Sequence, residues 1–336
     1  MSTKSVQTIA DIARIANVSK STVSRALNDS PLIKDETKEL IRAIAREHNF
    51  HINAPARQLS RKQSATIGFV TCAYHKEFSV ADLFGLELSG GISRGLSAKG
   101  YDMLVVYVET QDTEWMHQYL DAGRVDGFIL YSSSRKQFHV RTLLKLGAPF
   151  IVWGVPQPNT HYPSVTGDNF NGGRLATQRL LDGSRRRIAF LGGPPDELEV
   201  QARYAGYETA LSDAGLAVDP ALVAHGDYSN TSGAVAMRQL FQQAPDLDAV
   251  FVNSDLMAVA AMNVIREQGR SIPEQVAVVG YDDLSIAEFS NPPLTTIRQN
   301  VPLAGKLLAQ NLIEYLQTGV VTNVTLPVDL VVRQSA

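Results

Sequence analysis

The fold of the N-terminal region is decided by residues 8–28, TIADIARIANVSKSTVSRALN. Thr8 precedes apolar residues at helical spacing, and Asp11, three residues later, suits a capping box, which predicts a first helix ending near Asn17. A second helix is predicted after Ser19, with a narrow apolar stripe that leaves most of its surface polar. Residues 35–48 carry a third amphipathic stripe, with acidic side chains in the first turn, where they suit the helix dipole.

Two short helices separated by a turn are typical of a helix-turn-helix when the second is small, hydroxyl-rich and basic. Such a motif places its second helix in the major groove of DNA. Lys20, Ser21 and Arg25 would then reach base edges, while the hydroxyls of Thr22 and Ser24 would suit phosphates. The alternative is a solvated helix in an ordinary three-helix bundle.

Charge is distributed unevenly along the chain. Residues 1–63 carry 11 Lys and Arg against 6 Asp and Glu, whereas the remainder carries 20 against 28. A basic head on an acidic body indicates that the head, rather than the whole molecule, contacts a polyanion.

Length and composition predict a structured protein of two to three domains. The chain has 336 residues, of which 44% are hydrophobic and 19% charged, and a domain averages about 150 residues. The longest apolar stretch, residues 256–262, is far shorter than the roughly 20 residues that a membrane-spanning helix needs. Residues 1–7 do not resemble a secretory signal, so we expect a cytoplasmic protein without membrane association.

The rest of the chain alternates apolar strands with helical stretches, as parallel sheets require. Two sets of strands are predicted, at 67–71, 103–108, 125–130 and 150–152, and then at 188–191, 222–225, 249–252 and 276–279. The predicted fold class is therefore α/β, with two doubly wound parallel-sheet lobes after a three-helix headpiece. Because open α/β sheets bind ligands at the carboxyl ends of their strands, we expect a site between the lobes.

Polar and aromatic side chains follow these strands or lie in adjoining loops. The candidate ligand-binding residues are Tyr74, Phe84, Asp168, Arg203, Tyr228, Ser254 and Asp282. Carboxylates and a guanidinium bind vicinal hydroxyls, and an aromatic face covers the apolar side of a pyranose ring, so the set suits a polyol. Simpler alternatives are a surface ion pair for Arg203, helix capping for Asp168 or Asp282, and core packing for Phe84.

Enzyme motifs find little support. Residues 91–95, GISRG, match the G-x-S-x-G pattern, but they lie inside a predicted helical stretch, residues 83–98, and not between a strand and a helix. We interpret them as small residues that pack a helix onto a sheet. The sequence contains neither a dinucleotide-binding nor a P-loop glycine motif, and its seven histidines lack metal-ligand spacing. We predict no catalytic residue, metal or cofactor.

Several motifs resemble the lactose-repressor (LacI/GalR) family of bacterial transcription regulators. Residues 8–13, 18–19 and 22–28 are similar to the family's headpiece signature, and Ala56-Arg57-Gln58-Leu59 is similar to its hinge helix. Five further motifs follow in the family's order, at 167–169, 172–174, 203–206, 280–283 and 293–297. The resemblance covers nearly the whole chain.

The resemblance implies a DNA-binding repressor that acts as a homodimer on a double-stranded operator. A small-molecule effector would control its affinity for DNA, and we expect this effector to be a sugar. It implies a headpiece at 1–50, a hinge helix and linker at 51–62, and an effector-binding and dimerisation domain of periplasmic-binding-protein type at 63–336. Within that domain, lobe 1 would comprise about 63–164 plus 295–323, and lobe 2 about 165–294 plus 324–336. The alternatives are a nucleobase or another metabolite as corepressor, and a sugar receptor that does not bind DNA.

The resemblance also assigns residues to DNA. These are Thr8, Ser19, Lys20, Ser21, Thr22, Ser24, Arg25, Asn28, Ala56, Arg57 and Leu59. Leu59 of each hinge would enter the minor groove, and Ala56 would pack between the paired hinges. The hinge helix is too short to be stable in isolation, so we expect it to become ordered when it binds DNA together with the hinge helix of a second copy of the chain. Ser254 stands where sugar-binding relatives often have Asn, which leaves a larger ligand open.

Overall fold

The computed structural model describes residues 8–50, 63–72, 83–108, 114–131 and 137–336. The chain forms two compact units, residues 1–64 and 65–336. The expected hinge at 51–62 lies outside the described residues, as do the side chains of Tyr74, Ala56, Arg57 and Leu59.

The headpiece contains the three expected helices, α1 (Ile9–Ile15), α2 (Lys20–Leu27) and α3 (Asp35–Glu47). Their facing stripes form one small core, in which Ile12, Val23 and Ile41 are fully buried. The predicted capping box is confirmed, because Thr8 Oγ1 accepts from the Asp11 backbone N–H while the Asp11 carboxylate accepts from the Thr8 N–H. Local sequence signals alone therefore define this unit.

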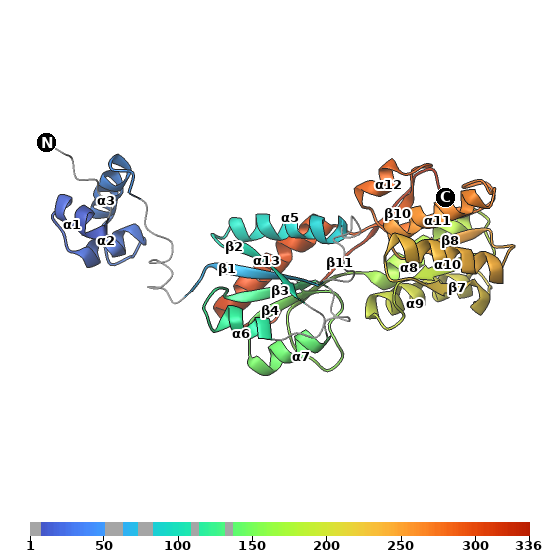
Figure 1. The fold of residues 1–336 in the computed structure, drawn as a ribbon, viewed down its shortest axis with the longest axis horizontal. Helices are drawn as coiled ribbons and strands as arrows, with labels where there is room; N and C mark the ends of the chain where they lie inside the picture. Colours follow the sequence, from blue (N-terminus) through green and yellow to red (C-terminus); the bar gives the residue numbers. More distant parts are fainter. Residues whose placement is uncertain (1–7, 51–62, 73–82, 109–113, 132–136) are drawn as a thin grey trace. The chain divides into compact units, whose positions relative to one another are not determined.

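The first lobe of the larger unit is a six-stranded parallel sheet in the order β11-β5-β4-β3-β1-β2. Its strands are β1 (Thr66–Cys72), β2 (Asp102–Val108), β3 (Gly127–Tyr131), β4 (Phe150–Trp153), β5 (Ser164–Gly167) and β11 (Asn323–Leu326). Helices α5 (Leu83–Ser97) and α13 (Val301–Thr318) cover one face, and α6 (Glu114–Leu120) and α7 (Gln137–Leu146) the other (Figure 1).

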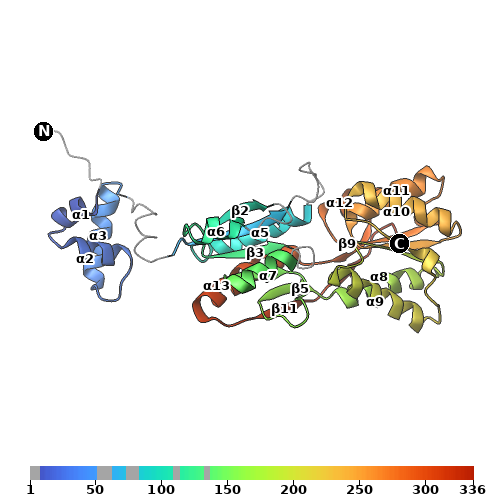
Figure 2. The ribbon, with the colours of Figure 1, turned by 60° about the horizontal axis from the view of Figure 1, so that its bottom comes forward.

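The second lobe is a six-stranded sheet in the order β12-β10-β9-β8-β6-β7. Its strands are β6 (Ile188–Gly192), β7 (Val223–His225), β8 (Ala249–Val252), β9 (Ala277–Asp282), β10 (Thr295–Arg298) and β12 (Asp329–Val331). Helices α8 (Asn169–Asp182) and α9 (Leu198–Asp213) cover one face, and α10 (Asn230–Gln243) and α11 (Asp255–Glu267) the other (Figure 2). The short α12 (Ser285–Phe289) follows β9, and only β12 pairs antiparallel among these strands.

Two doubly wound lobes are thus confirmed, but the expected boundaries between them need correction. Strand β10, residues 295–298, pairs with β9 and belongs to the second lobe, whereas β11, residues 323–326, pairs with β5 in the first. The chain therefore returns to the first lobe after Arg298, at the start of α13, and leaves it again after β11. Both strands are only four residues long, and only their pairing with distant strands shows to which sheet each belongs.

The G-x-S-x-G residues lie inside α5, as predicted. Ile92 packs on the core beneath the sheet, whereas the two glycines, Gly91 and Gly95, pack against helix α13. A Cβ atom at Gly91 would come within 2.5 Å of the Pro302 carbonyl oxygen, and one at Gly305 within 2.5 Å of the Leu88 carbonyl oxygen. Small residues on both helices therefore let α5 and α13 approach closely.

Gly91→Ala is expected to lower the free energy of unfolding of the larger unit by about 1–3 kcal/mol, because the added methyl overpacks the contact between α5 and α13. The neighbouring Gly90→Ala is the matched control, since its Cβ would meet only the flexible Arg94 side chain at 3.9 Å. That control should be neutral or stabilise by about 0.5–1 kcal/mol. Urea unfolding measures both, and equal effects would disprove the close contact.

In the described part of the chain, no helix combines the length and the apolar character needed to cross a lipid bilayer.

Candidate DNA interface and effector site

Helix α2 exposes two cations, Lys20 and Arg25. Within the described residues, neither is held in an ion pair. By contrast, Arg14, Lys38 and Arg42 of the same unit each pair with a headpiece carboxylate at 2.9–3.5 Å. The basic residues of α2 therefore keep their hydrogen-bond donors for an external anion.

Three predicted DNA-binding residues form helix caps. Thr8 begins α1, Ser19 Oγ accepts from the Thr22 backbone N–H at 3.0 Å, and Asn28 Nδ2 donates to the Ser24 carbonyl at 2.8 Å. These bonds fix the ends of α1 and α2 and so orient the face that carries Lys20 and Arg25. Ser21, Thr22 and Ser24 lie on α2 itself.

Arg203 is the centre of the candidate effector site in the second lobe. It projects from α9 and is 6% exposed, which rules out the surface ion pair considered above. Its Nε donates to Asn169 Oδ1 at 2.8 Å, its Nη1 donates to the Asn253 carbonyl at 2.7 Å, and its guanidinium carbon lies 3.7 Å from the centroid of the Tyr281 ring. The guanidinium is therefore rigidly placed.

Asp282 ends β9 with its side chain buried and its backbone in the left-handed region, at a φ of 112°. Its Oδ1 accepts from Gln299 Nε2 at 2.8 Å. Burial raises the pKa of Asp282 to about 7 although the nearby Arg203 charge and the Gln299 hydrogen bond lower it, and Glu87 of the first lobe adds to the increase. Asp282 caps no helix, because α12 begins after Leu284.

Two other candidates do cap helices. Asp168 Oδ1 accepts from the Asn171 backbone N–H at 3.1 Å at the start of α8, and Ser254 Oγ accepts from the Met257 N–H at 3.3 Å at the start of α11. The capping alternative therefore holds for Asp168. The amide absent at Ser254 is present one residue earlier, at the fully buried Asn253.

Tyr228 donates its hydroxyl hydrogen to Glu197 Oε2 at 3.0 Å. Burial, together with the Glu197 charge, raises the pKa of Tyr228 well above its ordinary value. Glu197 is itself buried. Sequence reasoning missed Glu197, because this residue directly precedes α9 and belongs to no motif.

Phe84, at the start of α5, lies against two aromatic residues at strand ends. Its ring stacks on Tyr131 of β3 with centroids 5.7 Å apart, and it lies 5.7 Å from the ring of Trp153 of β4. Phe84 also packs on the core of the first lobe, so core packing and a contact with ligand are both compatible with its place. Tyr131 and Trp153 were missed because the predicted strands, 125–130 and 150–152, stop one residue before them, and neither residue belongs to a motif.

The two lobes meet at the same ends of their strands. The backbone N–H of Val155 in the first lobe donates to Glu199 Oε1 in the second lobe at 2.8 Å. Burial raises the pKa of Glu87 in the first lobe, and the negative charge of Asp283 in the second lobe raises it further. Buried polar atoms also keep unused hydrogen-bonding capacity among the described residues. These atoms are both side-chain polar atoms of Asn253, the Tyr281 hydroxyl and Gln299 Oε1. Such groups favour a polar ligand or ordered water.

A helix-turn-helix unit joined to two parallel-sheet lobes with a polar site at the strand ends defines the class of DNA-binding regulators with a binding-protein-like body. Residues 8–53 match the bacterial regulatory proteins of the lacI family, and residues 177–336 match the periplasmic binding protein-like domain. The HTH-type transcriptional regulator CelR of Thermobifida fusca is 36% identical over 98% of both chains.

Solved structures agree with these matches. The CelR–cellobiose complex is 34% identical, with a TM-score of 0.76 over 98% of this chain and 99% of that one. The lac repressor dimer bound to operator and the anti-inducer ONPF is 30% identical, with a TM-score of 0.81 over 99% of both. The chain belongs to the LacI family and, like these relatives, is a transcription regulator and not an enzyme. Because residues 8–53 match this family of regulators, the alternative of a sugar receptor that does not bind DNA has no support.

Proposed function

We propose that this regulator is a cytoplasmic repressor that binds its operator as a homodimer and that a neutral sugar, bound between the two lobes, sets its affinity for DNA. The observation that carries this proposal is the buried cluster of Arg203, Asp282 and Asn253, which combines a fixed guanidinium, a carboxylate and an unused amide. The similarity to a cellobiose-bound regulator supports a sugar of this kind.

The charge of the site supports a neutral ligand. The charge of Glu87 raises the pKa of Asp282, and the charges of Asp282 and Glu199 both raise the pKa of Arg203. Three carboxylates therefore act at this site, and Arg203 is the opposing charge. Sugar hydroxyls donate to carboxylates, whereas a phosphate or carboxylate ligand would be repelled. Phe84 and Trp153 provide an aromatic surface for the apolar face of a sugar ring.

Control of DNA binding requires that the effector prefer one arrangement of the lobes. An inducer must bind the DNA-incompetent state more tightly, and a corepressor the competent state. Gln299 lies where the chain passes from β10 to α13, and it donates to Asp282. Ligand contacts at Asp282 would therefore act directly on a segment that crosses between the lobes.

The experiment that tests this function has two arms. An operator is selected from random duplexes, and its binding is titrated with salt, where phosphate contacts impose a steep negative slope. Cellobiose, ribose, glucose 6-phosphate and guanine are then screened for an increase in the melting temperature, because a ligand of the folded state stabilises it. No preference among duplexes would end the proposal for DNA, and stabilisation by guanine alone would favour the nucleobase corepressor.

The affinity for a neutral sugar is expected to increase from about pH 6 to about pH 8. Burial raises the pKa of Asp282 from 3.8 to about 7, so the folded protein binds a proton that the unfolded chain releases. The stability without ligand therefore decreases as pH rises through 7. A sugar hydroxyl donates a hydrogen bond to the ionised Asp282 carboxylate. The affinity for the sugar therefore increases as Asp282 loses its proton. Calorimetric titration at both pH values measures the change, and Asp282→Asn should remove it. The same pH dependence in that variant would assign it to another group.

The proposed homodimer uses an exposed sheet edge. β2 is one of the two edge strands of the first lobe, and its Tyr107 and Val105 are 61% and 55% exposed. Exposed apolar edge strands are templates for pairing. Tyr107→Lys is expected to shift the protein towards monomers in analytical ultracentrifugation and to weaken operator binding. A fully dimeric variant would place the interface elsewhere.

A further inference from the structure

The turn that carries Asp282 has a backbone conformation that side chains rarely adopt. Asp282 and the following Asp283 both have positive φ angles, 112° and 59°. Residues other than glycine avoid this region because the Cβ atom approaches the backbone. Such a conformation persists where the surrounding contacts over-determine it.

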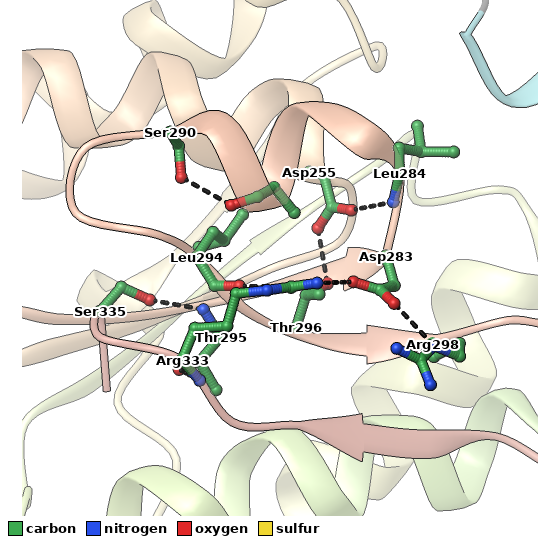
Figure 3. Close-up of polar contacts among 11 residues, drawn as sticks. Asp255, Asp283, Leu284, Ser290, Leu294, Thr295, Thr296, Arg298, Arg333 and Ser335 are labelled. Carbon is green, nitrogen blue, oxygen red and sulfur yellow. Dashed lines mark hydrogen bonds and ion pairs between the residues drawn. The ribbon is translucent and has the colours of Figure 1, made fainter.

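The Asp283 side chain supplies contacts of this kind. It is 7% exposed, its Oδ2 accepts from Arg298 Nε at 2.6 Å, and its Oδ1 accepts from Arg333 Nη2 at 2.6 Å. Arg333 is fixed in turn, since its Nη1 donates to the Leu294 carbonyl at 2.8 Å and its backbone N–H to Thr295 Oγ1 at 2.9 Å. Figure 3 shows Asp283 between the two arginines, which come from β10 and from the segment after β12.

A second carboxylate holds the next residue of the turn. The fully buried Asp255, the first residue of α11, accepts from the Leu284 backbone N–H at 2.8 Å and from Thr296 Oγ1 at 2.6 Å (Figure 3). The turn 282–284 is thereby tied to β10 at two points. Because Gln299 follows Arg298 and donates to Asp282, these contacts also fix the Asp282 carboxylate relative to the chain crossing.

We propose that Asp283 is a positioning residue of the effector site: its ion pairs with Arg298 and Arg333 hold the 282–284 turn so that the Asp282 carboxylate meets the effector. This inference rests on the proposed function. Arg298 and Arg333 each engage one of the Asp283 carboxylate oxygens, so the role assigned to Asp283 is to place Asp282 and not to bind the effector itself.

Asp283→Asn is the direct test, with cellobiose as the probe. Asn keeps the shape of Asp and tolerates positive φ, but it removes the charge that binds both arginines. We expect about tenfold weaker binding of cellobiose, within the range of coupling between neighbouring residues, and unchanged operator affinity without ligand. In an Asp282→Asn background, the same substitution should have little further effect, because the carboxylate to be positioned is gone.

Arg298→Gln is the milder variant, and Arg238→Gln is its matched control. Both arginines are about half exposed, at 51% and 48%, and each pairs with one carboxylate, Arg238 with Glu267 at 2.8 Å. Arg298→Gln should weaken cellobiose binding by a few fold, and Arg238→Gln should leave it unchanged. If Asp283→Asn fails to fold, Arg298→Gln and Arg333→Gln are measured in both backgrounds instead.

The outcomes separate the two proposals. A loss of affinity that is equal with and without Asp282, or no loss at all, overturns the positioning role even if the wild-type protein binds sugar. A lower melting temperature with unchanged cellobiose affinity shows a purely structural role and also overturns it. Failure of the wild-type protein to bind any sugar of the panel would instead contradict the proposed function.

Discussion

Arg203→Ala is expected to weaken effector binding at least about a hundredfold and to abolish the effector's influence on DNA, while leaving operator affinity unchanged. Hydrogen bonds of a charged donor contribute about 1.5–3 kcal/mol each, and the guanidinium organises more than one partner in a buried site. Its loss also leaves Asn169 Oδ1 and the Asn253 carbonyl without their donor. Titration of the repressor–operator complex with the sugar identified in the screen measures the effect.

Arg270→Ala is the matched control in the same lobe. Arg270 also lies over an aromatic ring, 4.8 Å from the centroid of Phe241, and donates to the Leu247 carbonyl. It follows α11, at the opposite end of that helix from Ser254. The control should therefore lose stability without losing the effector response. Arg203→Lys should be intermediate, because an ammonium keeps the charge but lacks the planar fork. If Arg203→Ala destroyed operator affinity in a folded dimer, the division between reading DNA and sensing ligand would be wrong.

The sequence was most informative where structure is local. The headpiece helices follow from capping residues such as Thr8 and Ser19 and from apolar spacing, and the central strands of both lobes read as apolar runs because they are buried on both faces. β5, β10, β11 and β12 were not predicted, since they are only three or four residues long and partly polar. Their existence depends on partners that are distant in the sequence.

The candidate site was predictable only in part for the same reason. Arg203 and Asp282 were predicted because they follow predicted strands or adjoining turns and also lie in family motifs, and both lie in the buried cluster. Asn253, Glu197 and Gln299 belong to no motif, and they reach the site because parallel strands end at one edge. Sequence spacing does not encode which neighbours a buried side chain meets after folding.

Arg25→Ala is expected to weaken specific operator binding by about 1–3 kcal/mol, the value of a good contact between arginine and a guanine edge, and to relax specificity at one base pair of each half-site. The expectation follows from exposure and from pairing. Arg25 is exposed on α2 and, among the described residues, is held by no ion pair, so binding DNA breaks no internal contact.

Arg42→Ala supplies the comparison within the same headpiece. Arg42 donates to Asp29 at 2.9 Å and to Glu39 at 3.0 Å, so its charge is already engaged, and its removal should change operator affinity little. Fluorescence anisotropy against the selected operator and against variants at each base pair distinguishes the two. Lys20→Ala tests the other predicted base contact. If Lys20 reaches a base edge, its loss relaxes specificity as the loss of Arg25 does, whereas loss of a phosphate contact would weaken binding to all sequences alike and reduce the salt slope by about one. Equal losses from Arg25→Ala and Arg42→Ala would mean that total charge, and not the exposed face of α2, determines binding.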